Sequence, residues 1–108
     1  EGPLWHPLRM ELFWFDIHTR QLLSKRRKWQ FSEYVSAAGW ISRDELLIAS
    51  QSQLFRFNLQ NEMCETICDL EHNKPHNRSN DGRSDSKGGF WIGTMGINAE
   101  PCAGAIYR

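Results

Sequence analysis

The chain has 108 residues, which is enough for one modest domain with a core of limited size. Lys and Arg together number 13, and so do Asp and Glu, so the formal net charge is zero and nothing predicts a nucleic-acid or membrane surface. No apolar run approaches the roughly 20 residues of a membrane-spanning helix, and no signal-peptide pattern appears. We expect a cytoplasmic protein, although a chain that begins at Glu1 rather than Met leaves secretion open.

Short runs of large apolar and aromatic residues predict an all-β chain. The first run is residues 11–14, and the outer strands of this first unit must fit within residues 21–31. That region contains the only basic cluster, residues 25–28, for which a solvated turn or an edge strand is expected. Asp16, directly after the first apolar run, is expected to cap the following turn rather than to bind a metal.

Three segments repeat one pattern, in which a turn precedes an acidic or small residue and three apolar positions. They are residues 11–14, 45–48 and 89–92, and their starts are 34 and then 44 residues apart (45 − 11 and 89 − 45). Two alternating runs, residues 53–59 and 65–70, lie between the second and third copies. One unit therefore holds about four strands, as a β-propeller blade does at a period of roughly 40–45 residues. A small β-sandwich or barrel with coincidental repeats is the alternative.

Residues 1–108 are therefore predicted to be the N-terminal part of a single β-propeller domain, covering about two and a half blades. The first blade is shortened near residues 21–31. The third is incomplete, because residues 103–108 begin a strand without a following partner. Open sheet edges of this kind favour self-association.

The segment of residues 77–95, NRSNDGRSDSKGGFWIGTM, concentrates polar groups before a strand at residues 90–92. The Asp81-Gly82 pair and residues 84–89 are typical of turns. Arg78 and Asn80 are two positions apart, so they share one face if the backbone is extended, and a guanidinium beside a carboxamide can bind a small oxygen-rich ligand. The alternative is a turn with a surface salt bridge. Asp81 is expected to close an Asx-turn that fixes Asn80, and neither Asp16 nor Asp81 is assigned to catalysis.

The three cysteines, Cys64, Cys68 and Cys102, form an odd set without zinc spacing. In an extended strand Cys64 and Cys68 lie roughly 13 Å apart, too far for a disulfide. We expect three free thiols packed as small hydrophobic side chains in a reducing compartment. His72 and His76 are four residues apart, but Pro75 argues against the helix that would make them a metal pair.

An ordered set of motifs carries a resemblance over essentially the whole chain. The set resembles the SMP-30/gluconolactonase/LRE-like family, whose animal member is regucalcin. The motifs are EGPLW at residues 1–5, LFWFDI at 12–17, NRSNDGR at 77–83, FWIGTM at 90–95 and GAIY at 104–107.

The resemblance implies a six-bladed β-propeller with one divalent metal ion in the central tunnel and hydrolysis of a sugar lactone as its activity. It implies that Glu1 is a metal ligand and that Arg78 and Asn80 contact the substrate. It places two further ligands, an Asn and an Asp that is the proposed base, after Arg108, so no catalytic residue is predicted within this segment. An acidic substrate contact expected after residues 93–95 is not matched, and Glu100 is the nearest carboxylate.

A carboxylate with an Asn carbonyl and a second carboxylate forms a hard oxygen site, which suits Ca²⁺ first and also Mg²⁺, Mn²⁺ or Zn²⁺. Such an ion can polarise a lactone carbonyl. The alternative function is that of a non-catalytic or degenerate propeller segment serving as a binding scaffold. The 108 residues alone, with one of three protein ligands, are not expected to hydrolyse lactones.

Overall fold

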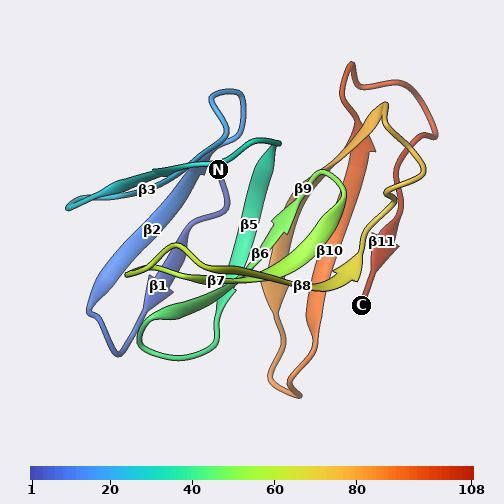
Figure 1. Ribbon diagram of the computed structural model, residues 1–108. Coiled ribbons are helices and arrows are strands. Elements are labelled where there is room, and N and C mark those ends of the chain that lie inside the picture. The colour runs from blue at the N-terminus through green and yellow to red at the C-terminus, as the bar shows by residue number, and fades with distance from the viewer.

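A computed structural model describes residues 1–108 as eleven strands in three antiparallel sheets (Figure 1). The first sheet contains β1 (Leu4–His6), β2 (Glu11–Asp16), β3 (Gln21–Ser24) and β4 (Lys28–Gln30). The second contains β5 (Val35–Trp40), β6 (Glu45–Ser50), β7 (Gln53–Asn58) and β8 (Cys64–Asp69). The third contains β9 (Asn77–Ser84), β10 (Phe90–Gly96) and β11 (Ile106–Tyr107). The all-β expectation is confirmed.

Each sheet is a simple meander in which sequential strands are neighbours. The three repeated segments become β2, β6 and β10, the second strand of each sheet, so the repeat in the sequence is a repeat of whole sheets. The structure contains strands and turns only, and it has no helix long and apolar enough to cross a membrane.

The first strands of the sheets lie side by side, with β5 between β1 and β9. The Ser36 hydroxyl on β5 meets the Ser79 hydroxyl on β9, and Gly39 of β5 lies against the Ser84 side chain at the other end of β9. Residue 36 thus lies next to residue 79, and residue 39 lies next to residue 84. Because both numbers increase together, β5 and β9 run in the same direction. The N-terminus lies at the end of the molecule where β5 begins (Figure 1). This is the arrangement of inner strands around a propeller axis.

The core between the first and second sheets is large and aromatic. Phe13 and Phe15 of β2 are buried with Trp29 of β4, and they face Phe55 and Phe57 of β7. Phe13 and Trp29 have ring centroids 5.9 Å apart in a tilted arrangement, while Phe55 and Phe57 pack edge to face at 6.4 Å. Aliphatic side chains complete the cluster: Ile17, Leu22, Val35, Ala38, Leu46, Ile48 and Leu59.

The core between the second and third sheets is smaller. Its buried members are Ala37, Ala49, Leu70 and Ile92, with Leu54 and Phe90 packed at its margin. Two buried serines, Ser36 and Ser79, join the same interface through a hydroxyl–hydroxyl hydrogen bond of 2.6 Å. Small side chains let β5 and β9 approach closely, so this interface is narrow and partly polar.

The prediction of a turn at Asp81-Gly82 is wrong. Both residues lie inside β9, whose register with β10 pairs Gly82 with Ile92 and Ser79 with Thr94. Asn80 and Asp81 together oppose the single residue Gly93, which is a β-bulge, and Asp81 Oδ1 accepts a hydrogen bond from the Gly82 amide at 2.9 Å within the strand. The predicted turn over residues 84–89 does form: Asp85 accepts bonds from the Lys87 and Gly89 amides between β9 and β10.

Other expectations divide between confirmation and correction. Residues 25–27 form the exposed connection between β3 and β4, and Asp16 Oδ1 accepts a bond from the Thr19 amide at 3.2 Å, capping its turn as expected. The cysteines are free, but all three are exposed, so the expectation that they pack as small hydrophobic side chains is wrong. Cys64 and Cys68 fall on β8, the outer strand of the second sheet, which has no sheet beyond it.

Candidate metal and substrate site

Glu1 is held in place by its backbone. The Phe15 amide donates to the Glu1 carbonyl at 2.8 Å, and the Glu1 backbone nitrogen donates to the Phe15 carbonyl at 3.0 Å. These two bonds continue the pairing of β1 with β2 beyond Leu4. The Glu1 side chain is exposed, and no group of the chain forms a hydrogen bond or an ion pair with its carboxylate. The backbone is therefore fixed, while the carboxylate oxygens are available to a ligand.

Gly2 lets the backbone next to Glu1 lie close to β5. Its φ is +55°, a conformation that side chains rarely adopt, and a Cβ at this position would clash with the Ser36 carbonyl. Only a glycine at position 2 therefore allows the chain to pass this close to Ser36 and Ala37. Gly2 brings Glu1 to the start of the inner strands, where Ser36 in turn contacts Ser79.

Glu1 and Arg78 line one cavity of about 370 Å³, although they are 77 positions apart in sequence (78 − 1). Arg78 comes from β9 of the third sheet, and the other lining residues belong to the first sheet and its β2–β3 turn. The structure thus brings the predicted metal ligand and a predicted substrate residue together. The remaining lining residues are Trp14, Phe15, Asp16, Ile17, His18 and Leu23.

Asn80 lies beside Arg78 and is oriented by it. The Arg78 Nη1 donates to the Ser79 carbonyl at 2.9 Å and to Asn80 Oδ1 at 3.3 Å. The same-face expectation for Arg78 and Asn80 is therefore met, because the segment is an extended strand. With its oxygen bonded to the guanidinium, Asn80 keeps its amide nitrogen available as a donor.

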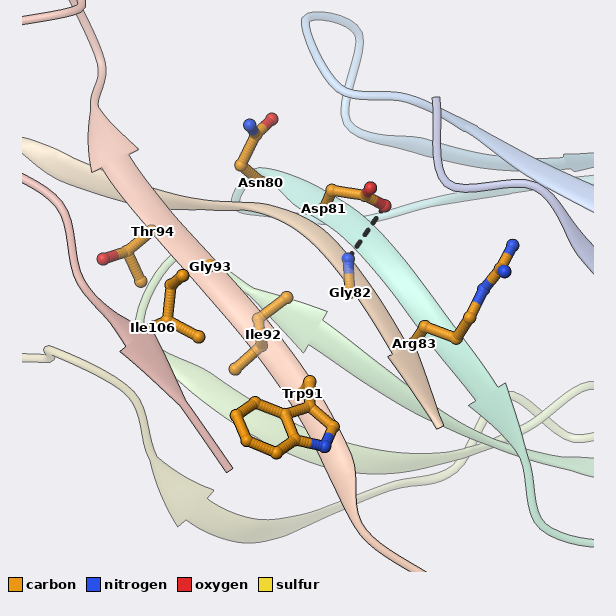
Figure 2. Close-up of a pocket in the computed structure, with 9 residues that line it drawn as sticks. All are labelled: Asn80, Asp81, Gly82, Arg83, Trp91, Ile92, Gly93, Thr94 and Ile106. Carbon is orange, nitrogen blue, oxygen red and sulfur yellow. Dashed lines mark hydrogen bonds between the residues drawn. The ribbon is translucent and has the colours of Figure 1, made fainter. Parts of the chain in front are cut away.

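Asn80 itself lines a neighbouring hollow of about 350 Å³ on the face of the third sheet that points away from the second sheet (Figure 2). The floor of this hollow is Gly93, flanked on β10 by Trp91 and on β11 by Ile106 (Figure 2). The bulge opposite Gly93 displaces Asn80 and Asp81 from the regular pleat. Bulges commonly re-aim side chains next to functional sites.

The residues on either side of Arg78 anchor β9. Asn77 is buried, and its amide donates to Glu71 at 3.0 Å and to the Ala103 carbonyl at 2.7 Å. Ser79 is fully buried, and its hydroxyl accepts a hydrogen bond from the Ser36 hydroxyl. Since side chains alternate along a strand, the inward residues 77 and 79 fix the outward residues Arg78 and Asn80.

Glu71 supports this anchor through its charge. Only 3% of its side chain is exposed, and burial by itself would raise the pKa of this carboxyl. Hydrogen bonds from Asn77, Tyr107, Thr94 and Lys74 outweigh that penalty and lower the pKa of Glu71 below its ordinary value. The Tyr107 hydroxyl donates to Glu71 at 2.8 Å, and this bond raises the pKa of Tyr107. The anion therefore ties the β8–β9 connection to β9 and β11.

The residues present fit one part of a divalent-metal site. Glu1 offers a carboxylate without a protein partner at a cavity that also holds Asp16, one oxygen of which already caps Thr19. Within residues 1–108 there is no group of three His, Cys, Asp or Glu side chains that could hold an ion. Glu1 thus fits the role of a single hard oxygen ligand.

The other residues considered from the sequence lie outside this cavity. Glu100 accepts a hydrogen bond from the Asn98 amide at 2.7 Å, so its carboxylate caps its own loop. His72 and His76 fall in the exposed connection between β8 and β9, and the His72 ring contacts Asp69 at 3.5 Å. Neither histidine belongs to a group of three or more side chains that could hold a metal ion.

Sequence reasoning missed the residues that hold the site together. These residues act through contacts in the tertiary structure: Gly2, Ser36, Asn77 and Ser79. The alternation of buried and outward side chains over residues 77–80 can be recognised only once the segment is known to be a strand. His18 was not singled out either, because a histidine in a turn carries no local pattern that separates it from a surface residue.

Comparison with known proteins yields a consistent set of matches. The family model described as the SMP-30/Gluconolactonase/LRE-like region matches residues 1–108. The chain is 39% identical over 114 aligned positions to a protein of Rhizobium meliloti (strain 1021) named "Putative sugar lactone lactonase", covering 100% of this chain and 38% of that protein. It is 28% identical to the 6-deoxy-6-sulfogluconolactonase of Pseudomonas putida, covering 100% of this chain and 39% of the relative. The chain thus spans about two fifths of the length of these relatives.

Solved structures agree with the fold. Regucalcin from Agrobacterium tumefaciens str. C58, described as a calcium-binding protein, matches with a TM-score of 0.93 at 39% identity, over 99% of this chain and 38% of that chain. A luciferin-regenerating enzyme matches with a TM-score of 0.88 at 22% identity, over 99% of this chain and 40% of that one, and this likeness concerns the fold alone. The expectation of an all-β chain forming part of a β-propeller is confirmed.

Proposed function

The chain belongs to the SMP-30/gluconolactonase/LRE-like family, and we propose that the complete protein is a metal-dependent hydrolase of sugar lactones. The observation that carries the proposal is the single cavity faced by Glu1 and Arg78, with Asn80 bonded to the Arg78 guanidinium. The names of two relatives, a sugar lactone lactonase and a sulfogluconolactonase, support the choice of substrate class. The calcium-binding description of the Agrobacterium structure supports a divalent cation, for which we propose Ca²⁺.

Glu1 would hold the cation together with ligands from outside residues 1–108. A bound divalent ion supplies Lewis acidity toward a carbonyl oxygen and lowers the pKa of a coordinated water. Glu1 is suited to this role because its backbone is fixed on both sides by Phe15 while its carboxylate has no partner in the chain. A fixed position lowers the entropy cost of ligation.

Arg78 and Asn80 would position the lactone. Arg78 keeps donor groups beyond those used on Ser79 and Asn80, and a guanidinium can bind sugar hydroxyls or a carbonyl that gains negative charge. Asn80 would add one amide donor in a direction set by its bond to Arg78. Both side chains stand on a strand whose neighbouring positions are buried and hydrogen-bonded, which keeps the geometry constant during the reaction.

Two substitutions in the complete protein separate metal binding from substrate handling. Glu1→Gln should weaken Ca²⁺ affinity and lower gluconolactone hydrolysis together, because a neutral amide supplies less charge to the ion. Arg78→Ala should lower hydrolysis by about tenfold or more and leave Ca²⁺ affinity nearly unchanged. Calorimetry gives the affinity and a pH-stat assay gives the rate. Glu65→Gln, on the exposed strand β8, is the control for a change of charge alone.

The same experiment distinguishes an enzyme from the main alternative, a non-catalytic binding scaffold. A complete protein that binds Ca²⁺ but hydrolyses no lactone would favour a binding scaffold over an enzyme. Equal Ca²⁺ affinity in Glu1→Gln and the parent would remove Glu1 from the metal site.

The 108 residues alone should be inactive and prone to self-association. Trp5 is 52% exposed on the outer face of the first sheet, and Trp91 is 46% exposed on the outer face of the third. Apolar side chains on two open sheet faces favour association with another copy of the chain. Mass in solution and an assay with Ca²⁺, Mn²⁺ and Zn²⁺ check both statements, and an active monomer would contradict them.

A further inference from the structure

The turn between β2 and β3 presents one histidine to the cavity of Glu1 and Arg78. Two hydrogen bonds close this turn: Asp16 Oδ1 accepts one from the Thr19 amide at 3.2 Å, and the Ile17 carbonyl accepts one from the Arg20 amide at 3.1 Å. Arg20 then ties the turn to the connection before β5. Its guanidinium donates to the Ser32 carbonyl at 3.1 Å and lies 4.8 Å from the centre of the Tyr34 ring.

His18 occupies the second position of this turn with its ring unused. The side chain is exposed and forms no hydrogen bond or ion pair with the chain. His6 differs, because it is buried and its Nε2 lies 2.7 Å from the Ser42 carbonyl. A fixed backbone and a free ring at a cavity edge are the properties of a residue that contacts a ligand rather than the protein.

We propose that His18 contacts the substrate by hydrogen bonding to a hydroxyl group of the sugar ring, an inference that rests on the proposed function. A neutral imidazole offers one donor and one acceptor, which matches a hydroxyl that can both donate and accept. Arg78 can only donate, so the two residues recognise different features of the same ligand. They come from different sheets, His18 from the first and Arg78 from the third, so a sugar bound between them is held from two sides.

The consequence is selectivity for hydroxylated lactones. A site that hydrogen-bonds a substrate hydroxyl discriminates against an analogue without it, because the polar group of the site is then left unpaired. His18 should therefore favour polyhydroxylated lactones over plain ones. It has no assigned part in opening the ring, which depends on the cation and the groups at the carbonyl.

The test compares two lactones in the complete protein. His18→Ala should lower kcat/KM for gluconolactone by about tenfold and leave kcat/KM for δ-valerolactone, which lacks hydroxyls, within about twofold of the parent. His18→Gln, which keeps a donor and an acceptor, should recover part of the loss. His72→Ala, an exposed histidine of the β8–β9 connection, is the matched control and should change neither value.

Each outcome separates this inference from the proposed function. Equal losses on both lactones, or no loss on either, overturn the role of His18 while lactone hydrolysis stands. If the parent hydrolyses neither lactone, the proposed function fails, and His18 is judged by calorimetry with glucitol as a polyol probe. Weaker glucitol binding by His18→Ala then supports a hydroxyl contact, and equal binding, or no binding by the parent, overturns it.

Discussion

The two interfaces between the sheets are built differently, although both join neighbours in one repeating architecture. The first is filled by five buried aromatic side chains with aliphatic neighbours: Phe13, Phe15, Trp29, Phe55 and Phe57. The second contains Ala37, Ala49, Leu70 and Ile92, and the hydroxyl pair of Ser36 and Ser79 lies beside them. The first interface derives its stability from buried apolar area, and the second depends more on close approach and directed hydrogen bonds.

The difference follows the location of the site. Arg78 and Asn80 lie on β9, at the second interface, where hydrogen bonds from Asn77 and Ser36 fix the strand to its surroundings. Hydrophobic attraction has no preferred direction, whereas a hydrogen bond loses strength as its distance and angle change. The narrow polar interface therefore specifies the position of Arg78 and Asn80, while the aromatic interface stabilises the domain.

The largest effect is expected at the first interface. Phe13→Ala removes a fully buried ring that packs against Trp29, and it should lower the free energy of unfolding of the complete protein by about 3–5 kcal/mol. Denaturant unfolding measures the loss. Ile67→Ala, at a residue 51% exposed on β8, is the control and should cost less than about 0.5 kcal/mol. Similar costs for the two variants would contradict the view that the first interface dominates stability.

The sequence predicted the repeating strands because their signal is local. Residues 11–14, 45–48 and 89–92 alternate or cluster apolar side chains after turns, and they form β2, β6 and β10. The inner strand β9 was missed as a strand because residues 77–84 are almost entirely polar and contain Asp81-Gly82. Its extended form is imposed by pairing with β10 and packing on β5, a tertiary effect that strand propensity does not report.

The candidate site, like the fold, could be predicted from the sequence only in part. The motif resemblance named Glu1, Arg78 and Asn80, and the structure places the first two at one cavity and bonds the third to Arg78. Their roles in binding stay predictions. The supporting residues Gly2, Ser36 and Ser79 could not be found from sequence, because each matters through a contact with a different strand.

A smaller effect is expected from the hydroxyl pair of the second interface. Ser36→Ala and Ser79→Ala should each cost about 1–2 kcal/mol, because each removes the main hydrogen-bond partner of the opposite buried hydroxyl. The double substitution should cost less than the sum of the two, since no unpaired hydroxyl then remains. Ser79 keeps a weak alternative in the Ala49 carbonyl at 3.4 Å, so Ser36→Ala should be the milder change.

A double-mutant cycle on the free energy of unfolding measures this coupling. If the second interface positions Arg78, Ser36→Ala and Ser79→Ala should also reduce lactone turnover. Phe13→Ala, assayed well below its unfolding temperature, should leave turnover per folded molecule nearly intact. Additive costs in the cycle, or greater loss of turnover in Phe13→Ala, would reverse the assignment of the two interfaces.

The smallest effect concerns the charge of Glu71 and is confined to acid. Hydrogen bonds in the folded state lower the pKa of Glu71, so its stabilising contribution is complete above the unfolded value of 4.5 and is lost as pH falls through the folded value. Tyr107→Phe removes one of these bonds and moves the folded pKa back toward its ordinary value. The variant should therefore lose less stability than the parent between about pH 5 and pH 3.

Free energies of unfolding at several pH values measure this slope, with Tyr34→Phe as the control because its hydroxyl bonds no carboxylate. Identical slopes for Tyr107→Phe and the parent would mean that Tyr107 does not help to hold Glu71 as an anion, and that Asn77, Thr94 and Lys74 lower its pKa without it.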